Sequence, residues 1–170
     1  MYRKESALAN CSIARALEQV GDGWTLLIVR ECTHGTKRFD EFHKQLGIAR
    51  NILTMRLERL TERGILERYP LEERANTQGY RLTTKGEELY PVLVSLMQWG
   101  DRWASLEGKA PVVLVSAMSG QSVERIQVRE INGTPLSFKE IRFEPGPGVT
   151  AATQLVIETR NARILEVESK

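Results

Sequence analysis

The chain has 170 residues, of which 41% are hydrophobic and 27% charged, and its formal net charge is +2. This composition is typical of an ordinary globular protein and excludes a disordered tail. No apolar run reaches the ~20 residues of a membrane-spanning helix, and no apolar stretch follows the charged N-terminus, so we expect a cytoplasmic protein without a membrane partner. Two cysteines and two histidines are too few for a disulfide framework or a structural zinc site, and we expect no metal and no cofactor.

Hydrophobic spacing predicts four helices in the first third of the chain. The first has Asn10 or Ser12 as its cap and runs to residue 20, and the others cover residues 24–33, 39–46 and 50–63. An alternating run at 65–69, a polar stretch at 71–79 and a second run at 80–83 then predict a β-hairpin. Residues 84–106 are predicted to form one longer helix, with an apolar face wider than one small core requires.

The character of the sequence changes after residue 106. Alternating or β-branched runs predict strands at residues 112–115, 123–131, 136–143 and 154–159. The Asn132-Gly133 pair between two of these runs predicts a hairpin turn. We therefore expect a first domain at residues 1–106 and a small β-rich C-terminal domain at residues 107–170.

Positive charge is concentrated between Lys37 and Arg74, where nine basic residues accompany seven acidic ones. The same segment holds helix, tight turn, helix and hairpin, which is the order of a winged helix-turn-helix, whose second helix enters the major groove of DNA. The predicted fold class is therefore α+β: a winged helix-turn-helix, mostly α with a β-hairpin wing, followed by the β-rich appendage.

Helical geometry separates the residues of the second helix, 50–63, into two faces. With Leu53 at the centre of the buried side, Asn51, Thr54, Met55 and Glu58 project from the opposite side, and the first three have side chains that suit contacts with adenine and thymine edges. Further DNA-contacting candidates are basic: Lys37, Arg38 and Arg74 for phosphates, Arg50 for a base or a phosphate, and Arg56 and Arg59 for phosphates or for intramolecular pairing. The alternating charges on this helix are equally typical of a solvated helix face.

Several spaced motifs resemble the HxlR-type transcriptional regulators. They are Cys11-Ser-Ile-Ala-Arg-Ala-Leu17, Gly23-Trp-Thr-Leu-Leu-Ile-Val-Arg-Glu31, Arg38-Phe-Asp-Glu-Phe42, Leu53-Thr-Met-Arg-Leu57, Gly64-Ile-Leu-Glu-Arg68, Tyr80-Arg-Leu-Thr-Thr-Lys-Gly86 and Leu96-Met-Gln-Trp-Gly100. The resemblance covers about residues 8–104. It implies a homodimeric winged-helix regulator that pairs through its N-terminal and post-wing helices. It also places the recognition helix at residues 50–63 and the wing at 71–79, although the wing departs from the common form in its low basic charge.

The resemblance also bears on the two cysteines and on the C-terminal extension. Cys11 matches a cysteine that responds to peroxide, quinone or aldehyde in some members, and Arg15 one turn later would favour its thiolate. The alternative is an inert cysteine, and Cys32 is expected in the core. Related extensions often carry a Cys-x-x-Cys pair, but both cysteines of this chain lie before residue 107, so metal binding is absent there.

The leading hypothesis is a sequence-specific homodimeric transcriptional regulator that binds a pseudo-palindromic operator in double-stranded DNA, with repression favoured over activation. A small-molecule effector or thiol oxidation would supply its signal. The alternative is a ligand- or redox-sensing module that uses the winged helix for protein interaction without specific DNA binding. No nucleophile, base and orienting group occur at a recognisable spacing, so an enzyme is not expected, and His34 and His43 are expected at the surface.

Overall fold

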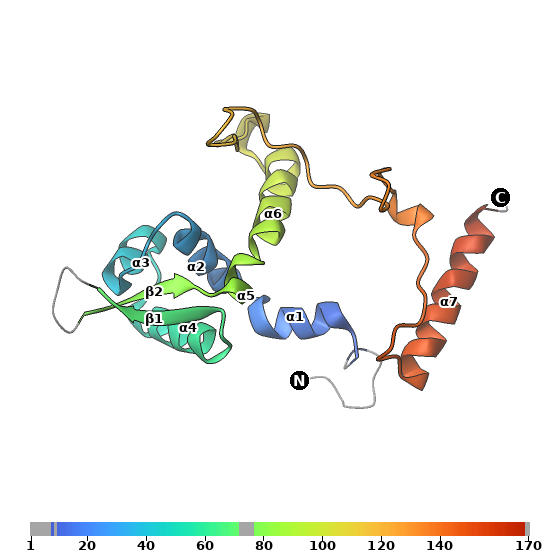
Figure 1. Ribbon diagram of the computed structural model, residues 1–170, viewed down its shortest axis with the longest axis horizontal. Helices are drawn as coiled ribbons and strands as arrows, with labels where there is room; N and C mark the ends of the chain where they lie inside the picture. Colours follow the sequence, from blue (N-terminus) through green and yellow to red (C-terminus); the bar gives the residue numbers. More distant parts are fainter. Residues whose placement is uncertain (1–7, 9, 72–76, 169–170) are drawn as a thin grey trace. The chain divides into compact units, whose positions relative to one another are not determined.

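The computed structural model describes residues 8, 10–71 and 77–168 (Figure 1). The chain divides into two compact units: residues 21–126 form one, and residues 1–20 together with 127–170 form the other. No helix among the described residues combines the length and apolar character that crossing a membrane would require. The predicted domain division at residues 106 and 107 stays a prediction.

Three helices at the start of the 21–126 unit occupy the predicted places. They are α2 (Gly23–Thr33), α3 (Phe39–Leu46) and α4 (Arg50–Glu62). Each contributes its apolar stripe to one core, in which burial of aliphatic and aromatic side chains supplies the main stabilisation. The largest fully buried side chains are Phe42, Ile28, Ile48, Leu53, Leu57, Leu60, Ile65, Leu66 and Val29.

The predicted hairpin is an antiparallel pair of strands, β1 (Leu66–Pro70) and β2 (Gln78–Leu82), with Leu66 opposite Leu82. Two contacts fasten this wing to the helices. The Tyr80 ring packs edge-on against Phe42, with 6.3 Å between ring centroids. The Tyr80 amide donates to the Lys37 carbonyl at 2.8 Å, which ties β2 to the segment before α3. The wing is therefore part of the same packed body as the core.

The single helix expected at residues 84–106 is wrong, because two helices occupy this stretch. They are α5 (Thr84–Glu87) and α6 (Tyr90–Trp103). Pro91 lies in the first turn of α6, and a proline lacks an amide hydrogen and its ring clashes with the carbonyl four residues earlier. That residue is Glu87, at which α5 ends. Proline therefore breaks a stretch that its apolar spacing alone would continue.

The strand expected at residues 154–159 is also wrong. Helix α7 (Ala151–Glu168) covers this stretch. The amide of Gln154 donates to the Thr150 carbonyl at 2.8 Å, and the Thr150 hydroxyl accepts from the Thr153 amide at 3.3 Å, so Thr150 caps the helix. Good helix formers on both sides of the short β-branched run outweigh its strand preference.

The remainder of the predicted β-rich appendage is mostly extended chain without a sheet. Within residues 107–163 the described positions include two isolated β-bridges, Val115 with Ser122 and Arg129 with Pro135, and no buried residue. The turn at Asn132-Gly133 is present, and Gly133 has a φ of +91°. Strand-like sequence did not produce a sheet because no described partner strand pairs with it beyond these bridges.

The other unit contains α1 (Ser12–Val20) as well as α7. The Asn10 side chain donates to the Gly148 carbonyl at 2.9 Å and to the Thr153 hydroxyl at 3.1 Å. The Asn161 side chain bonds both backbone groups of Phe143, at 2.7 and 3.1 Å. Side-chain amides therefore hold together segments that share little apolar packing.

Candidate nucleic-acid interface

Helix α4 has one buried and one open face, as its sequence predicts. Leu53, Leu57 and Leu60 are at most 1% exposed. On the opposite face Asn51, Thr54, Met55 and Arg59 are all exposed. The Thr54 hydroxyl donates to the Arg50 carbonyl at 3.0 Å, which leaves its oxygen lone pairs able to accept another hydrogen bond. These four residues, all predicted to contact DNA, thus share one solvent-exposed surface.

The first turn of α4 has no side-chain cap. Ala49 occupies the N-cap position and makes no capping hydrogen bond through its side chain. The amide hydrogens of the first turn of a helix have no partner within the helix, and they carry the positive end of its dipole. This end of α4 therefore has donors available for a phosphate oxygen.

Arg50 lies beside that helix end and contacts α3. Its guanidinium donates to Asp40 Oδ1 at 2.8 Å and lies 5.5 Å from the centre of the Phe39 ring. Both charged side chains are mostly exposed, so the ion pair is weak and exchanges readily with water or another anion. Arg50 is consequently positioned at the open face without being locked there.

Lys37 and Arg38 precede α3, and their backbone is held by one carboxylate. Glu41 Oε2 accepts from the amides of Lys37 at 3.1 Å and Arg38 at 3.0 Å. Hydrogen bonds from the Arg38 and Lys37 amides, in that order of effect, lower the pKa of Glu41 below its usual value. The Lys37 side chain is exposed and that of Arg38 half-buried, so a fixed backbone presents the Lys37 ammonium to solvent.

Arg56 does not belong to the open face. Its guanidinium lies 3.2 Å from Asp22 Oδ2, and its side chain is 19% exposed. Asp22 also caps α2, because its Oδ1 accepts from the Thr25 amide at 2.9 Å and its Oδ2 from the Thr25 hydroxyl at 2.6 Å. Of the two roles considered for Arg56, the structure shows the intramolecular pairing, through which α2 positions α4.

The turn between α3 and α4 depends on Gly47 and His43. Gly47 has a φ of +62°, the left-handed conformation that glycine adopts at low cost. His43 was expected at the surface, but it is half-buried, and its Nδ1 lies 2.7 Å from the Ile48 carbonyl oxygen. Because a carbonyl only accepts, the imidazole must donate from Nδ1. Nothing in the sequence around His43 and Ile48 indicates this contact. His34 is exposed as expected.

Arg74 lies outside the described residues, since positions 72–76 of the wing tip are not described. The strands beside the tip carry two cation–π contacts, Arg68 over Tyr80 and Arg81 over Tyr69, at 5.6 and 5.0 Å from the ring centres. Arg81 also donates to Glu67 at 2.6 Å. In the described part of the wing, these two arginines thus contact side chains of the wing's own strands.

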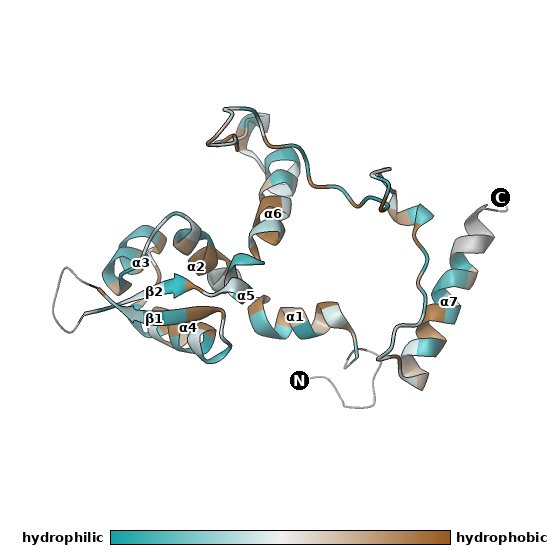
Figure 2. Ribbon diagram, viewed as in Figure 1, coloured by the Kyte–Doolittle hydropathy of each residue, from teal (hydrophilic) through white to brown (hydrophobic). Residues whose placement is uncertain are grey.

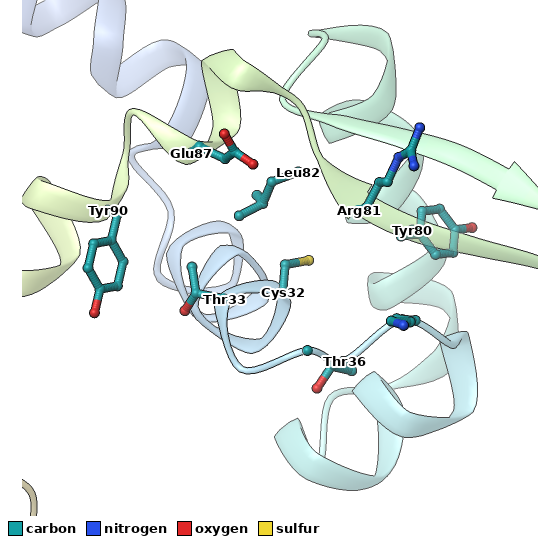
Figure 3. A pocket seen from close by; sticks show the side chains of 10 residues that line it. Cys32, Thr33, Thr36, Tyr80, Arg81, Leu82, Glu87 and Tyr90 are labelled. Carbon is teal, nitrogen blue, oxygen red and sulfur yellow. The ribbon is translucent and has the colours of Figure 1, made fainter. Parts of the chain in front are cut away.

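The two cysteines have different surroundings. Cys32 lines a pocket of about 560 Å³ near the end of α2, where Thr33 and Thr36 lie close by and Leu82 and Glu87 come from the opposite wall (Figure 3). Burial first, and then the charge of Glu31, raise the pKa of Cys32 to about 12. Its thiol is therefore protonated and unreactive at neutral pH.

Cys11 is half-buried and directly precedes α1. The Arg15 guanidinium, expected to favour a Cys11 thiolate, donates instead to Asn10 Oδ1 at 3.4 Å and to Ser12 Oγ at 3.2 Å. Among the described residues no three His, Cys, Asp or Glu side chains are grouped as metal ligands would be.

Comparison with known proteins decides the family. Residues 19–107 match the family model of the HxlR-like helix-turn-helix, a stretch that holds all of α2 through α6. The chain belongs to the HxlR-like helix-turn-helix family. The family resemblance and the α+β winged-helix fold predicted from the sequence are both confirmed.

Relatives of this HxlR-like protein extend the match over most of its length. MT3179, an HTH-type transcriptional regulator of Mycobacterium tuberculosis (strain CDC 1551 / Oshkosh), is 37% identical over 140 residues, which are 82% of this chain and 89% of the relative. The crystal structure of PA1607, a candidate transcription factor, is 43% identical with a TM-score of 0.76 and covers 84% of this chain and 98% of its own.

A second solved structure, the candidate transcription factor PA1374 of Pseudomonas aeruginosa, is 38% identical with a TM-score of 0.59 over 85% of this chain and 99% of its own. The redox regulator HypR in its oxidised form is 27% identical with a TM-score of 0.52 and covers 56% of this chain and 100% of its own. The HxlR-like protein is thus a DNA-binding transcriptional regulator of the helix-turn-helix class and not an enzyme.

Proposed function

We propose that this HxlR-like regulator is a homodimeric repressor that places α4 of each copy in the major groove of a pseudo-palindromic operator. The observation that carries the proposal is the open face of α4, where Asn51, Thr54 and Met55 are exposed opposite a fully buried leucine stripe. An amide, a hydroxyl with a methyl, and a thioether can contact the hydrogen-bonding edges of base pairs and the methyl group of thymine.

Phosphate contacts come from groups around that face. The uncapped N-terminus of α4 supplies amide donors, and Lys37, Arg50 and Arg59 supply mobile positive charge on exposed side chains. Arg38 is a further phosphate contact, and Arg74 adds one from the wing tip. Arg56 acts indirectly, since its ion pair with Asp22 orients α4.

The test is a titration of the full chain with the DNA upstream of its own gene and with a random duplex of the same length. Fluorescence anisotropy at several salt concentrations gives both affinities. We expect the upstream DNA to bind at least about a thousandfold more tightly, and both affinities to fall steeply with salt as counterions are released. Equal affinities for the two duplexes would contradict a specific regulator and favour the protein-interaction alternative.

Residue roles are separated by comparing Asn51→Ala with Lys37→Ala. Loss of a base contact relaxes preference at one operator position at a cost of about 1–3 kcal/mol, whereas loss of a phosphate contact weakens all duplexes nearly equally. Lys109→Ala is the matched control, because Lys109 is an exposed lysine that lies far along the chain from α4 and pairs with Glu107. If Asn51→Ala weakens every duplex by the same factor, Asn51 does not read a base.

The proposed dimer rests on a solvent-exposed apolar stripe of α6. Val92, Leu96, Trp99 and Trp103 follow one another at spacings of four, three and four, so they share one face of the helix. Figure 2 shows hydrophobic residues along the ribbon of α6. Trp99 and Trp103 are 61% and 65% exposed, which is costly for rings of this size in water. On α1, Ile13 and Leu17 are exposed at helical spacing as well.

Thiol sensing is a second candidate function, favoured by the likeness to the redox regulator HypR. Cys11 is the candidate sensor, because partial burial of Cys32 raises the pKa of that thiol and keeps it protonated. We expect oxidant to change the operator affinity of the wild type and of Cys32→Ser, but not of Cys11→Ser. If oxidant changes the operator affinity of Cys11→Ser as much as that of the wild type, Cys11 is not the sensor.

The sign of regulation is tested by deleting the gene, which should raise transcription from the bound promoter.

A further inference from the structure

A second and larger pocket lies between α2 and α6, within the 21–126 unit. Its volume is about 720 Å³, which is in the range of sites for small organic molecules. The lining side chains are mostly aliphatic and come from three segments of the chain: Leu26 and Leu27 from α2, Leu93 and Met97 from α6, and Val112 and Leu114 from the segment after α6.

The pocket uses a different face of α6 from the exposed tryptophan stripe. Tyr90, Leu93, Met97 and Asp101 line the pocket, at spacings of three, four and four residues. At 100° per residue, this set points well away from Val92, Leu96, Trp99 and Trp103, although Leu96 touches the edge of the pocket. A partner that covers the tryptophan stripe therefore leaves most of the pocket wall free.

The charges at the pocket wall do not cancel. Arg30 and Glu31 lie next to each other on α2 and form an ion pair, in which Arg30 Nε donates to Glu31 Oε1 at 3.0 Å. Asp101 is half-buried and makes no hydrogen bond or ion pair with another described residue. Arg125 lines a smaller adjoining pocket together with Asp101 but forms no ion pair with it. The large pocket thus carries one uncompensated negative charge.

We propose that the α2–α6 pocket binds an apolar organic cation, with the Asp101 carboxylate as its counter-charge. Burial of the hydrocarbon part of such a molecule against the apolar walls is favourable. The unpaired carboxylate beside these walls favours a positive charge, because charge interactions strengthen where water is excluded. An anion of the same shape meets repulsion from Asp101 in the same pocket. The site is separate from the open face of α4, so the proposal stands independently of the DNA contacts proposed above.

The test uses two ions of nearly equal shape and opposite charge, tetraphenylphosphonium and tetraphenylborate. Isothermal titration calorimetry of the full chain without DNA measures the affinity of each. We expect tetraphenylphosphonium to bind at one site per chain, and tetraphenylborate to bind at least about tenfold more weakly. Equal affinities, or tighter binding of the borate, would overturn the proposal.

Three variants locate the site. Asp101→Asn keeps the shape of the side chain and should weaken tetraphenylphosphonium binding at least about tenfold, whereas Glu88→Gln, which neutralises an exposed carboxylate that does not line the pocket, should leave it unchanged. Leu27→Trp fills the pocket and should abolish binding. Thermal unfolding confirms that each variant is folded.

An equal loss in Glu88→Gln and Asp101→Asn would show a general effect of net charge and overturn the assignment. Unchanged binding in Leu27→Trp would place the cation elsewhere and also overturn it. If the wild type binds neither ion and Leu27→Trp dissociates the dimer, the pocket is occupied by a second copy of the chain and the proposal is wrong. None of these measurements involves DNA, so their failure is distinct from failure of the proposed regulator function.

Discussion

At the scale of single residues, Asp22 connects two helices through one carboxylate. One oxygen caps α2 at the Thr25 amide, and the other accepts from the Thr25 hydroxyl and lies 3.2 Å from Arg56 of α4. The sequence marks Asp22 only as part of a turn between two glycines. Its second role appears only when α4 folds back beside α2.

We predict that Asp22→Ala lowers the free energy of unfolding by about 1–2 kcal/mol, since it removes a helix cap and leaves Arg56 without its partner. Urea unfolding measures the change. Asp40→Ala is the matched control: it breaks the exposed ion pair with Arg50, which should cost less than about 0.5 kcal/mol. Equal losses in the two variants would show that the Asp22 contacts contribute nothing special.

Cys32 gives a prediction about reactivity. Its pKa of about 12 leaves very little thiolate at pH 8, so we expect iodoacetamide to modify Cys32 roughly a thousandfold more slowly in the folded chain than in urea. Peptide mass spectrometry over time measures both rates. Similar rates in the two conditions would show that the Cys32 thiol is accessible to the reagent and that its pKa is not raised.

The same raised pKa makes a prediction about stability at high pH. The folded chain holds the Cys32 proton more tightly than the unfolded chain, so this contribution to stability is complete below pH 9.0 and is lost as pH rises toward 12. Wild type should therefore lose more stability between pH 8 and pH 10.5 than Cys32→Ala does. Parallel urea titrations at the two pH values test this, and identical losses would contradict it.

At the scale of elements, Gly86 decides how α5 packs. A Cβ atom there would lie 2.3 Å from the Ile65 carbonyl oxygen, a backbone atom that cannot move aside. Thr83 caps α5 at the Gly86 amide and donates to the Gly64 carbonyl at 2.6 Å. The end of α4, the start of the wing and α5 therefore meet at one point where only glycine fits.

We predict that Gly86→Ala destabilises the chain by about 1–3 kcal/mol through overpacking. Gly100→Ala is the control, because Gly100 lies inside α6 with open space around it, and alanine there should stabilise the helix by about 0.5–1 kcal/mol. Thermal unfolding at one protein concentration gives the sign of the stability change for both variants. A stabilising Gly86→Ala would refute the close approach.

At the scale of the whole molecule, the stripe on α6 predicts self-association. We expect Trp99→Asp to convert the proposed dimer into a monomer and to weaken operator binding, since a charge in an apolar interface remains without a partner. Sedimentation velocity measures the mass. Leu106→Asp is the control, because Leu106 is highly exposed but lies beyond the end of α6. A Trp99→Asp protein of unchanged mass would rule out this stripe as the interface.

The sequence by itself determined α2, α3, α4, the wing and the outward direction of Asn51, Thr54 and Met55. These features follow from local periodicity, from glycine at helix ends and from alternation in strands, all of which act between neighbours along the chain. The Pro91 break was also present in the sequence, but a continuous apolar pattern obscured it.

Only the tertiary structure decided the rest. The pairing of Arg56 with Asp22, the contact of His43 with Ile48, the protonated state of Cys32 and the pocket beside Asp101 all join residues from different elements or depend on burial. The β-branched runs after residue 106 form no sheet, since pairing requires a partner strand as well as a propensity. Local interactions select helices and turns, whereas burial and long-range contacts set charge, protonation and binding.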